Sequence, residues 1–192
     1  IDVVACRLGA DGRAAVPTHA EMTGSAIRQD GRSASLTAPS GLAQQGVLNA
    51  SLVDAHSRSN EVTVLEAHGT GTALGDPIEA GAMAAVYLAH RGGPAESSLH
   101  IGSLKANAGH TEPGAGLAGA LKLLVQMRDG NVSPNAQLRI LNPHVGGALG
   151  ADTACGLPTQ VTKKPWHVHT SRVGGVSSFG YSGTIAHAVI AV

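Results

Sequence analysis

The stretch 99–128, LHIGSLKANAGHTEPGAGLAGALKLLVQMR, constrains the fold more than any other part of the chain. Its apolar opening, 99–104, predicts a short strand, and the polar segment 105–110 predicts a compact loop. A helix is expected next, with Thr111 as its N-cap and a Glu-Pro pair in its first turn. A carboxylate suits the helix dipole there, and proline loses no hydrogen bond. The stretch therefore predicts a strand-to-helix corner that carries one lysine and one histidine.

The helix predicted after this corner combines an apolar face with several glycines. The expected inward face consists of Leu117, Leu121, Leu124 and Val125. The glycines are Gly114, Gly116 and Gly119. Each glycine costs about 1 kcal/mol relative to alanine in a helix interior. Their number therefore indicates that another backbone approaches this helix closely.

A second segment repeats the arrangement. EVTVLEA predicts a strand that ends at His68, and GTGTALG predicts a glycine–threonine loop after it. Asp76 is the expected N-cap of a helix that runs to about His90, with proline at the first helical position and Glu79 closing a capping box. Both histidines thus lie just past the carboxyl end of a strand, where ligand sites concentrate in α/β folds.

The rest of the chain fits an α/β fold with a mixed sheet. Further strands are expected at 1–8, 16–27, within 156–166, at 172–178 and at 185–192. Ser40 is the expected N-cap of a helix that runs to about Ser57. Its expected inward positions are Leu42, Leu48, Leu52 and Ala55.

Composition excludes several functional classes. The 192 residues carry no formal net charge, and the basic residues are scattered, so no nucleic-acid partner is expected. No apolar run is long enough to span a bilayer, and the start has no signal-peptide pattern, so we expect a cytoplasmic protein without a membrane partner. The two cysteines, Cys6 and Cys155, have no metal or redox spacing, and the His167-x-His169 pair lacks a third ligand, so no metal is expected.

The two corner histidines are the strongest candidates for chemistry. Each one alone is more often a turn or capping histidine, but two neutral imidazoles built the same way can donate hydrogen bonds to one carbonyl and stabilise an oxyanion or enolate. Lys105 and Glu112 flank His110 and can form an ion pair that fixes the loop. The alternative is a solvated surface pair of little energetic value.

Two loops are weaker candidates. Thr70 and Thr72 alternate with glycines and can bond a polar ligand that runs past His68, although turn chemistry explains them equally well. Phe179, Gly180 and Tyr181 begin a tight loop between two apolar strands. Its backbone can supply an oxyanion donor and its aromatic rings can gate a pocket, while a plain hairpin turn is the alternative.

With these residues assembled, the chain resembles the C-terminal half of a β-ketoacyl synthase from a modular polyketide synthase. EAHGTGTALGDPIEA at 66–80 and GSLKANAGHTEPGAG at 102–116 resemble the two histidine motifs of that family. GSAIRQDGRSASLTAPS at 24–40 resembles the opening of the C-terminal half, and GVSSFGYSGTIAHAVI at 175–190 resembles the terminal gating segment. The order and spacing of the motifs also agree.

The resemblance implies a thiolase-like condensing-enzyme fold and decarboxylative Claisen condensation, an acyltransferase reaction. A malonyl-type extender would arrive on the phosphopantetheine of an acyl carrier protein, and this chain would bind no cofactor of its own. The implied catalytic residues are His68, His110 and Lys105, with Glu112 as the partner of the lysine. Thr70 and Thr72 would contact the pantetheine. The backbone N–H of Tyr181, within the 179–181 gate, would help to form the acyl oxyanion hole.

The chain departs from the family pattern in two places. The nucleophilic cysteine belongs to an N-terminal half that this sequence lacks, and Cys155 follows both histidine motifs, so it is not expected to replace that nucleophile. Ile185 stands where the family usually has asparagine, which removes a polar anchor from the gate. We expect residues 1–23 to be strands that end the N-terminal half and 24–192 to be the C-terminal half.

The expected partners are therefore the N-terminal half or the rest of a larger synthase and an acyl carrier protein, and a homodimer is possible. The isolated piece is expected to be inactive. One alternative is a non-condensing ketosynthase-like protein that binds acyl carriers or controls chain length. A thiolase-like enzyme acting on coenzyme A thioesters is another, but the HGTGT and GHTE motifs favour the synthase.

Overall fold

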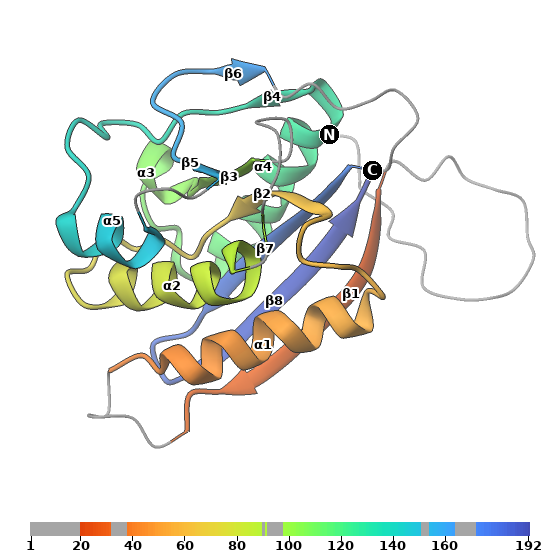
Figure 1. Ribbon diagram of the computed structural model, residues 1–192, viewed down its shortest axis with the longest axis vertical. Coiled ribbons are helices and arrows are strands. Elements are labelled where there is room, and N and C mark those ends of the chain that lie inside the picture. Colours follow the sequence, from red (N-terminus) through yellow and green to blue (C-terminus); the bar gives the residue numbers. More distant parts are fainter. Residues whose placement is uncertain (1–19, 32–37, 90, 92–97, 151–153, 164–171) are drawn as a thin grey trace, which may run out of the picture.

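The computed structural model describes residues 20–31, 38–89, 91, 98–150, 154–163 and 172–192. Its centre is a six-stranded mixed sheet (Figure 1). In spatial order the strands are β1 (Glu21–Gln29), β8 (Thr184–Ala191), β7 (Val173–Phe179), β2 (Val62–Glu66), β3 (Leu99–Gly102) and β5 (Cys155–Gly156). β7, β2, β3 and β5 run parallel, whereas β8 is antiparallel to both of its neighbours. The predicted α/β class and mixed sheet are confirmed.

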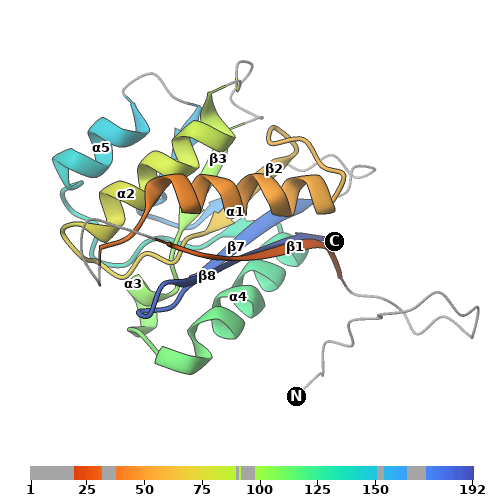
Figure 2. The same ribbon diagram turned by 90° about the horizontal axis from the view of Figure 1, so that it is seen from below.

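Helices cover both faces of this sheet (Figure 2). One face carries α1 (Gly41–Asp54) and α2 (Gly75–Met83), which continues as the π-helical turn η1 (Ala84–Leu88). α5 (Pro143–Leu149) lies beside α2, and α4 (Ala115–Asp129) covers the opposite face. A separate antiparallel pair joins β4 (Asn131–Val132) to β6 (Thr162–Lys163).

The two strands expected near the N-terminus differ in outcome. The expected strand at 1–8 lies outside the described residues, whereas the one at 16–27 corresponds to β1. The predicted boundary between the two halves of the synthase, 1–23 and 24–192, falls within β1. The assignment of these two segments to different halves stays a prediction. Among the described helices, none combines the length and the apolar character that a membrane crossing requires.

Small residues let the layers approach closely. A Cβ on Gly174 of β7 would lie 2.8 Å from Leu123 and 2.9 Å from Met127, two fully buried side chains of α4. On the other face, Leu48 of α1 and Leu65 of β2 belong to the larger core cluster. Each such side chain contributes about 1.5–3 kcal/mol on burial, so a core poor in aromatic rings is still well supported.

The buried face of α4 differs from the expected one. The buried residues are Ala115, Gly119, Leu123, Gln126 and Met127. Among the expected inward residues, Leu117, Leu121 and Val125 are 70%, 45% and 57% exposed, so the prediction is wrong for these three. It is right for Leu124, which is partly buried and packs against the core. The reason is steric, because the glycine- and alanine-bearing stripe brings the helix nearer to the sheet than a leucine stripe could. On α1 the inward assignment is right for Leu48 and Leu52 and wrong for Leu42, which is 80% exposed.

The helix starts also vary in how well they follow the sequence. The Ser40 hydroxyl accepts the Ala43 N–H at 3.2 Å, as expected for an N-cap. The segment after β3 is not a loop but a one-turn helix, α3 (Lys105–Ala108), followed by the 3₁₀ turn η3 (Glu112–Gly114). Thr111 makes no side-chain capping bond, and α4 begins only at Ala115.

One buried polar cluster was not expected. The Nδ1 atom of His187 in β8 lies 2.9 Å from the Ser177 hydroxyl in β7, and its Nε2 lies 3.0 Å from the Tyr87 hydroxyl in η1. Burial lowers the pKa of His187 to about 3, so the ring is a neutral bridge between two hydroxyl groups. His187 is therefore a satisfied core histidine that ties η1 to the sheet.

Candidate functional site

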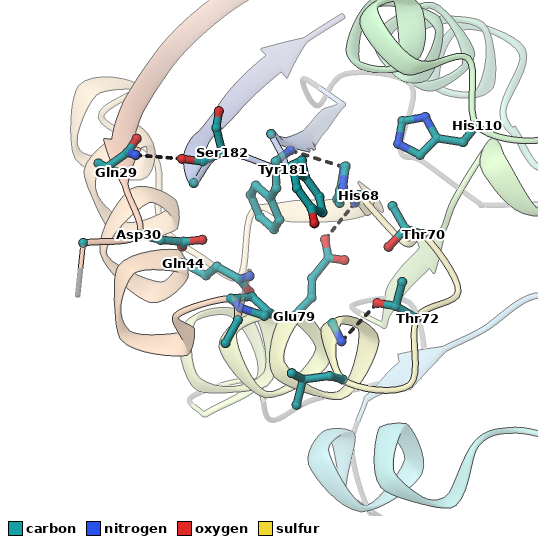
Figure 3. A pocket seen from close by; sticks show the side chains of 18 residues that line it. Gln29, Asp30, Gln44, His68, Thr70, Thr72, Glu79, His110, Tyr181 and Ser182 are labelled. Carbon is teal, nitrogen blue, oxygen red and sulfur yellow. Dashed lines mark hydrogen bonds between the residues drawn. The ribbon is translucent and has the colours of Figure 1, made fainter. Parts of the chain in front are cut away.

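The candidate site forms where three neighbouring parallel strands end together. β7, β2 and β3 are adjacent in the sheet, and their carboxyl ends lead to Phe179, His68 and Lys105. Since the carboxyl ends of parallel strands meet at one edge, residues far apart in the sequence are brought together here. Figure 3 shows His68 and His110 on the same side of the resulting pocket.

His68 is held from two directions. A buried carboxylate of α2, Glu79, accepts the His68 N–H at 2.7 Å and the Gly69 N–H at 2.9 Å. The backbone N–H of Phe179 in β7 donates to Nδ1 of the His68 ring at 3.2 Å. An Nδ1 that accepts a hydrogen bond carries no proton, so the ring proton of His68 is on Nε2.

Electrostatics keep His68 neutral. Burial lowers its pKa to about 4, and the neighbouring Lys105 and His110 act in the same direction. The pKa of Glu79, whose carboxylate accepts two N–H groups of this loop, shifts in the opposite direction. Complete burial raises it to about 7, although the two N–H donors lower it. At neutral pH His68 is thus a hydrogen-bond donor rather than a cation.

His110 is exposed and is oriented by its own loop. Its Nδ1 accepts the backbone N–H of Glu112 at 2.8 Å, so its ring proton is also on Nε2. This bond uses a left-handed backbone at Glu112, whose φ is 48°. The His68 and His110 ring centroids are 5.8 Å apart with the ring planes at 84°, and the predicted convergence of the two rings is confirmed.

The expected ion pair between Lys105 and Glu112 is wrong. Among the described residues it is absent, and Glu112 is exposed. Half-burial lowers the pKa of Lys105, while the charges of Glu66 and Glu79 oppose this effect. The carboxylates that act on Lys105 therefore come from β2 and α2, because the turn η3 directs the backbone of Glu112 toward His110 instead.

The site opens into a cavity of about 730 Å³ lined by His68, His110, Thr70, Thr72 and the 179–183 loop (Figure 3). The Thr72 hydroxyl accepts the Gly75 N–H at 3.1 Å, which supports the turn interpretation of this residue. The Tyr181 side chain is 87% exposed. Within the described part of the chain, the backbone N–H of Tyr181 has no hydrogen-bond partner. Lys105 lines a second cavity of about 550 Å³, which shares His110 and Glu79 with the first.

Sequence reasoning assigned Glu79 a different task. It was expected to close a capping box with Asp76, but the N-cap of α2 is Leu74, and the Asp76 carboxylate accepts the Gly71 N–H at 3.1 Å. Both carboxylates therefore bind the loop before the helix rather than the helix itself. The sequence signal that could have indicated this role is the run of glycines before the helix. Their backbone N–H groups need acceptors in the folded loop, and Asp76 and Glu79 supply them.

The Cys155 thiol is poorly suited to act as a nucleophile. Burial raises the pKa of the Cys155 thiol to about 11, and the residue packs against the core at the start of β5. A thiol in this environment is not a thiolate at neutral pH. No three His, Cys, Asp or Glu side chains gather as a metal site among the described residues, and His167 and His169 lie outside them.

Comparisons with known proteins identify the family of the chain. The family model described as β-ketoacyl synthase, C-terminal domain, matches residues 19–139. Mycoketide-CoA synthase of Mycobacterium tuberculosis is 45% identical over 91% of this chain, which covers 4% of that protein. The polyketide synthase GfsB of Streptomyces halstedii is 43% identical over 91% of this chain, which covers 3% of it. The chain thus spans less than a tenth of these curated relatives.

Solved structures give the same result. The ketosynthase from module 6 of the bacillaene synthase of Bacillus subtilis has a TM-score of 0.79 and 32% identity, with 91% of this chain and 31% of that chain covered. The oxazolomycin ketosynthase domain OzmH KS7 of Streptomyces albus has a TM-score of 0.81 and 28% identity, with 90% and 30% covered. The predicted thiolase-like fold is confirmed, and the chain belongs to the β-ketoacyl synthase family, in which it corresponds to the C-terminal domain.

Proposed function

We propose that this chain supplies the two histidines of a polyketide β-ketoacyl synthase, which condenses a carrier-bound malonyl-type extender with an acyl thioester. The observation that carries the proposal is the pair of Nε2–H donors. His68 and His110 each have Nδ1 occupied by a backbone N–H, and their rings lie 5.8 Å apart at one cavity. One thioester oxygen between them would receive two hydrogen bonds.

This pair suits the charge that develops during decarboxylation. The bond between the malonyl carbon and its carboxylate breaks, carbon dioxide leaves, and the electron pair moves toward the thioester oxygen as an enolate. Two fixed donors stabilise that oxygen more than they stabilise the neutral carbonyl. The enolate carbon then attacks the acyl thioester, and the sulfur of the acylated cysteine leaves as a thiolate.

Three other groups have supporting roles in this proposal. The Lys105 ammonium adds positive charge near the developing enolate. Thr70 and Thr72 contact the phosphopantetheine arm along the cavity that they line. The unpaired N–H of Tyr181 serves the oxygen of the acyl thioester as an oxyanion donor. The nucleophilic cysteine comes from an N-terminal half, since the partly buried thiol of Cys155, with its raised pKa, is unsuited to the task.

An exposed apolar helix face supports the N-terminal half as a partner. Leu117, Leu121 and Val125 of α4 are all at least 45% exposed on the face turned away from the sheet. Contiguous apolar side chains of this size usually meet another protein surface. We propose that the N-terminal half of the same synthase covers them and that the isolated chain does not condense substrates.

The test is decarboxylation of a malonyl-loaded carrier protein by the complete synthase that contains this chain. His68→Ala and His110→Ala should each lower the rate by roughly 10²–10³-fold, as removal of one oxyanion donor does in other enzymes. His144→Ala is the matched control, because His144 is exposed and lies outside the cavity. A His110→Ala synthase that decarboxylates at the wild-type rate would contradict the assigned role.

One observation favours a second candidate, a ketosynthase-like protein that binds acyl carriers without condensing them. Ile185 replaces the polar residue usual in the gating segment, and its side chain is only 1% exposed. The same assay separates the two functions. Appearance of the β-ketoacyl product supports condensation, whereas decarboxylation or carrier binding without that product supports the alternative.

A further inference from the structure

A buried ion pair connects the sheet to the helix behind the site. Glu66, the last residue of β2, points into the layer between the sheet and α4, where its carboxylate lies 2.6 Å from the Lys122 ammonium. The two side chains are only 4% and 11% exposed. Val64 and Val176 belong to the apolar cluster on this side of the sheet. A charge pair in such surroundings loses much hydration and is weak evidence for stability alone.

The same carboxylate also binds the segment that carries the lysine of the site. Its second oxygen accepts the backbone N–H of Leu104, the residue directly before Lys105. Glu66 therefore contacts a residue adjacent to Lys105, and it lies two positions before His68 in the chain. Through Lys122 it is also tied to α4, which follows His110. Three segments that lead to the candidate catalytic groups are thus connected by one carboxylate.

The packing around the pair leaves no room for larger residues. A Cβ on Gly119 of α4 would lie 3.0 Å from Cγ of Glu66. A Cβ on Gly102 of β3 would lie 3.3 Å from the Lys122 ammonium. The absence of side chains at Gly119 and Gly102 therefore leaves the space that the ion pair occupies. It also lets α4 lie close enough to the sheet for the ammonium and the carboxylate to meet.

We infer that Glu66 and Lys122 are positioning residues: Lys122 neutralises Glu66, so that the Lys105 ammonium stays near the two histidines. This inference rests on the proposed function of those histidines. If Lys122 were absent, the remaining cation that acts on the Glu66 carboxylate within the described residues would be Lys105 of α3. The lysine would then be drawn toward β2, away from the cavity edge that it shares with His110.

The charges that face these groups support this assignment. The Glu66 carboxylate lies in the field of two cations, Lys122 from α4 and Lys105 from α3. Burial raises the pKa of Glu66, whereas both cations lower it. At Lys105, the carboxylates Glu66 and Glu79 raise the pKa, whereas Lys122 lowers it. Lys122 thus offsets part of the attraction between Glu66 and Lys105. His68 experiences Lys105 and His110 and sits above Glu79, so its proton affinity reports where the lysine lies.

The central experiment compares Lys122→Met with the double variant Glu66→Gln/Lys122→Met in the complete synthase. In Lys122→Met the decarboxylation rate should fall on the order of 10–100-fold, the cost of misplacing a group by about 1 Å. The acid limb of the pH–rate profile should move to higher pH by roughly half a unit or more, because His68 loses a neighbouring cation. In the double variant the limb should return toward its wild-type position, since the unpaired carboxylate is gone.

Controls separate this role from a purely structural one. Lys122→Arg keeps the charge and should retain the wild-type limb, and Lys163→Met removes an exposed lysine of β6 and should change nothing. If Lys122→Met loses activity and stability without any movement of the limb, the pair only supports the fold and the inference is overturned. The inference is equally overturned if the double variant keeps the displaced limb.

A second readout does not depend on turnover. An NMR titration of the His68 ring in the complete synthase should show a higher pKa in Lys122→Met than in the wild type, with reversal in the double variant. If the wild-type synthase fails to decarboxylate the malonyl carrier while this titration behaves as expected, the proposed function fails and the electrostatic coupling stands. If the titration is identical in all variants, the coupling is absent.

Discussion

The two strand–loop–helix corners look alike in sequence and differ in how they hold their histidines. At the first corner, the Glu79 carboxylate of α2 accepts the backbone N–H of His68, and the backbone N–H of Phe179 in β7 donates to the His68 ring. At the second corner, the N–H of Glu112, two residues further along the same loop, is the only hydrogen-bond partner of the His110 ring among the described residues. The first histidine is half-buried and the second is exposed.

The difference shows that one chemical result can be reached by two kinds of support. In both rings a backbone N–H occupies Nδ1 and leaves Nε2–H free to donate. Tertiary contacts fix His68, so its position depends on two elements outside its own loop, α2 and β7. Local backbone geometry fixes His110, so it depends on the left-handed conformation at one residue. Variants that act on one support and leave the other intact test this distinction.

The largest effect is expected at the support of the first corner. Glu79→Ala leaves the N–H groups of His68 and Gly69 without their acceptors, and each unsatisfied buried N–H costs about 1–3 kcal/mol. We expect the unfolding free energy of the complete synthase to fall by roughly 3 kcal/mol and decarboxylation to fall by about 100-fold or more. Denaturant titration and the carrier assay measure the two quantities. An Ala variant with wild-type values would show that the carboxylate does not hold this loop.

A glycine in each corner helix provides the next comparison. Gly119→Ala in α4 would place Cβ 3.0 Å from Cγ of Glu66, and such overpacking costs about 1–3 kcal/mol. Gly81→Ala in α2 is the matched change, because nothing lies within 4 Å of its Cβ. There the lower entropy of the unfolded chain should stabilise the protein by about 0.4–1 kcal/mol. Thermal unfolding of the two variants should therefore shift in opposite directions, and equal shifts would contradict the packing described for α4.

The pH dependence of stability sharpens the account of the first corner. The pKa of Glu79 is raised from 4.5 to about 7 in the folded protein, so the folded state binds more protons than the unfolded state between these values. The contribution of Glu79 to stability is therefore complete below pH 4.5 and is lost as pH rises through about 7. Glu79→Gln cannot titrate. Relative to the wild type, the unfolding free energy of Glu79→Gln should therefore rise by up to about 1.4 kcal/mol per pH unit between pH 5 and 7. Unfolding of both proteins across that range checks the sign, and movement in favour of the wild type would refute the burial argument.

The smallest effect is expected at the side chain of Glu112. His110 uses only the backbone N–H of this residue, and the carboxylate is exposed and forms no ion pair with Lys105 among the described contacts. Glu112→Gln should therefore change the decarboxylation rate by less than about twofold, within the range of an exposed charge. A fall in the decarboxylation rate as large as that caused by Lys105→Ala would contradict this account and support the Lys105–Glu112 ion pair that the sequence predicts.

The sequence predicted the strands and the convergence of the histidines because both depend on local signals. The β-branched run before His68 and the apolar run before Lys105 mark strand ends, and parallel neighbours place such ends together. The buried face of α4 could not be predicted in the same way. Leu117 and Leu121 have the spacing of a core face, but the glycine stripe can approach the sheet more closely, and the sequence does not rank these two solutions.

Buried polar partners were also beyond the reach of sequence patterns. The spacing of Asp76 and Glu79 favours a capping box, yet both side chains turn to the N–H groups of the preceding glycine loop. His187 finds Tyr87 and Ser177 only through the pairing of β8 with β7 and the packing of η1. Such contacts depend on tertiary structure, since their members are far apart in the chain or compete with a local alternative.

The most direct measurement of the central claim is the protonation state of the two imidazoles, read from the ¹⁵N chemical shifts of His68 and His110 in the complete synthase at pH 7. We predict that His68 is neutral and that Nδ1 of both rings accepts a backbone N–H, which leaves the proton on Nε2. A proton on Nδ1 of either ring, or a cationic imidazolium at His68, would contradict this prediction.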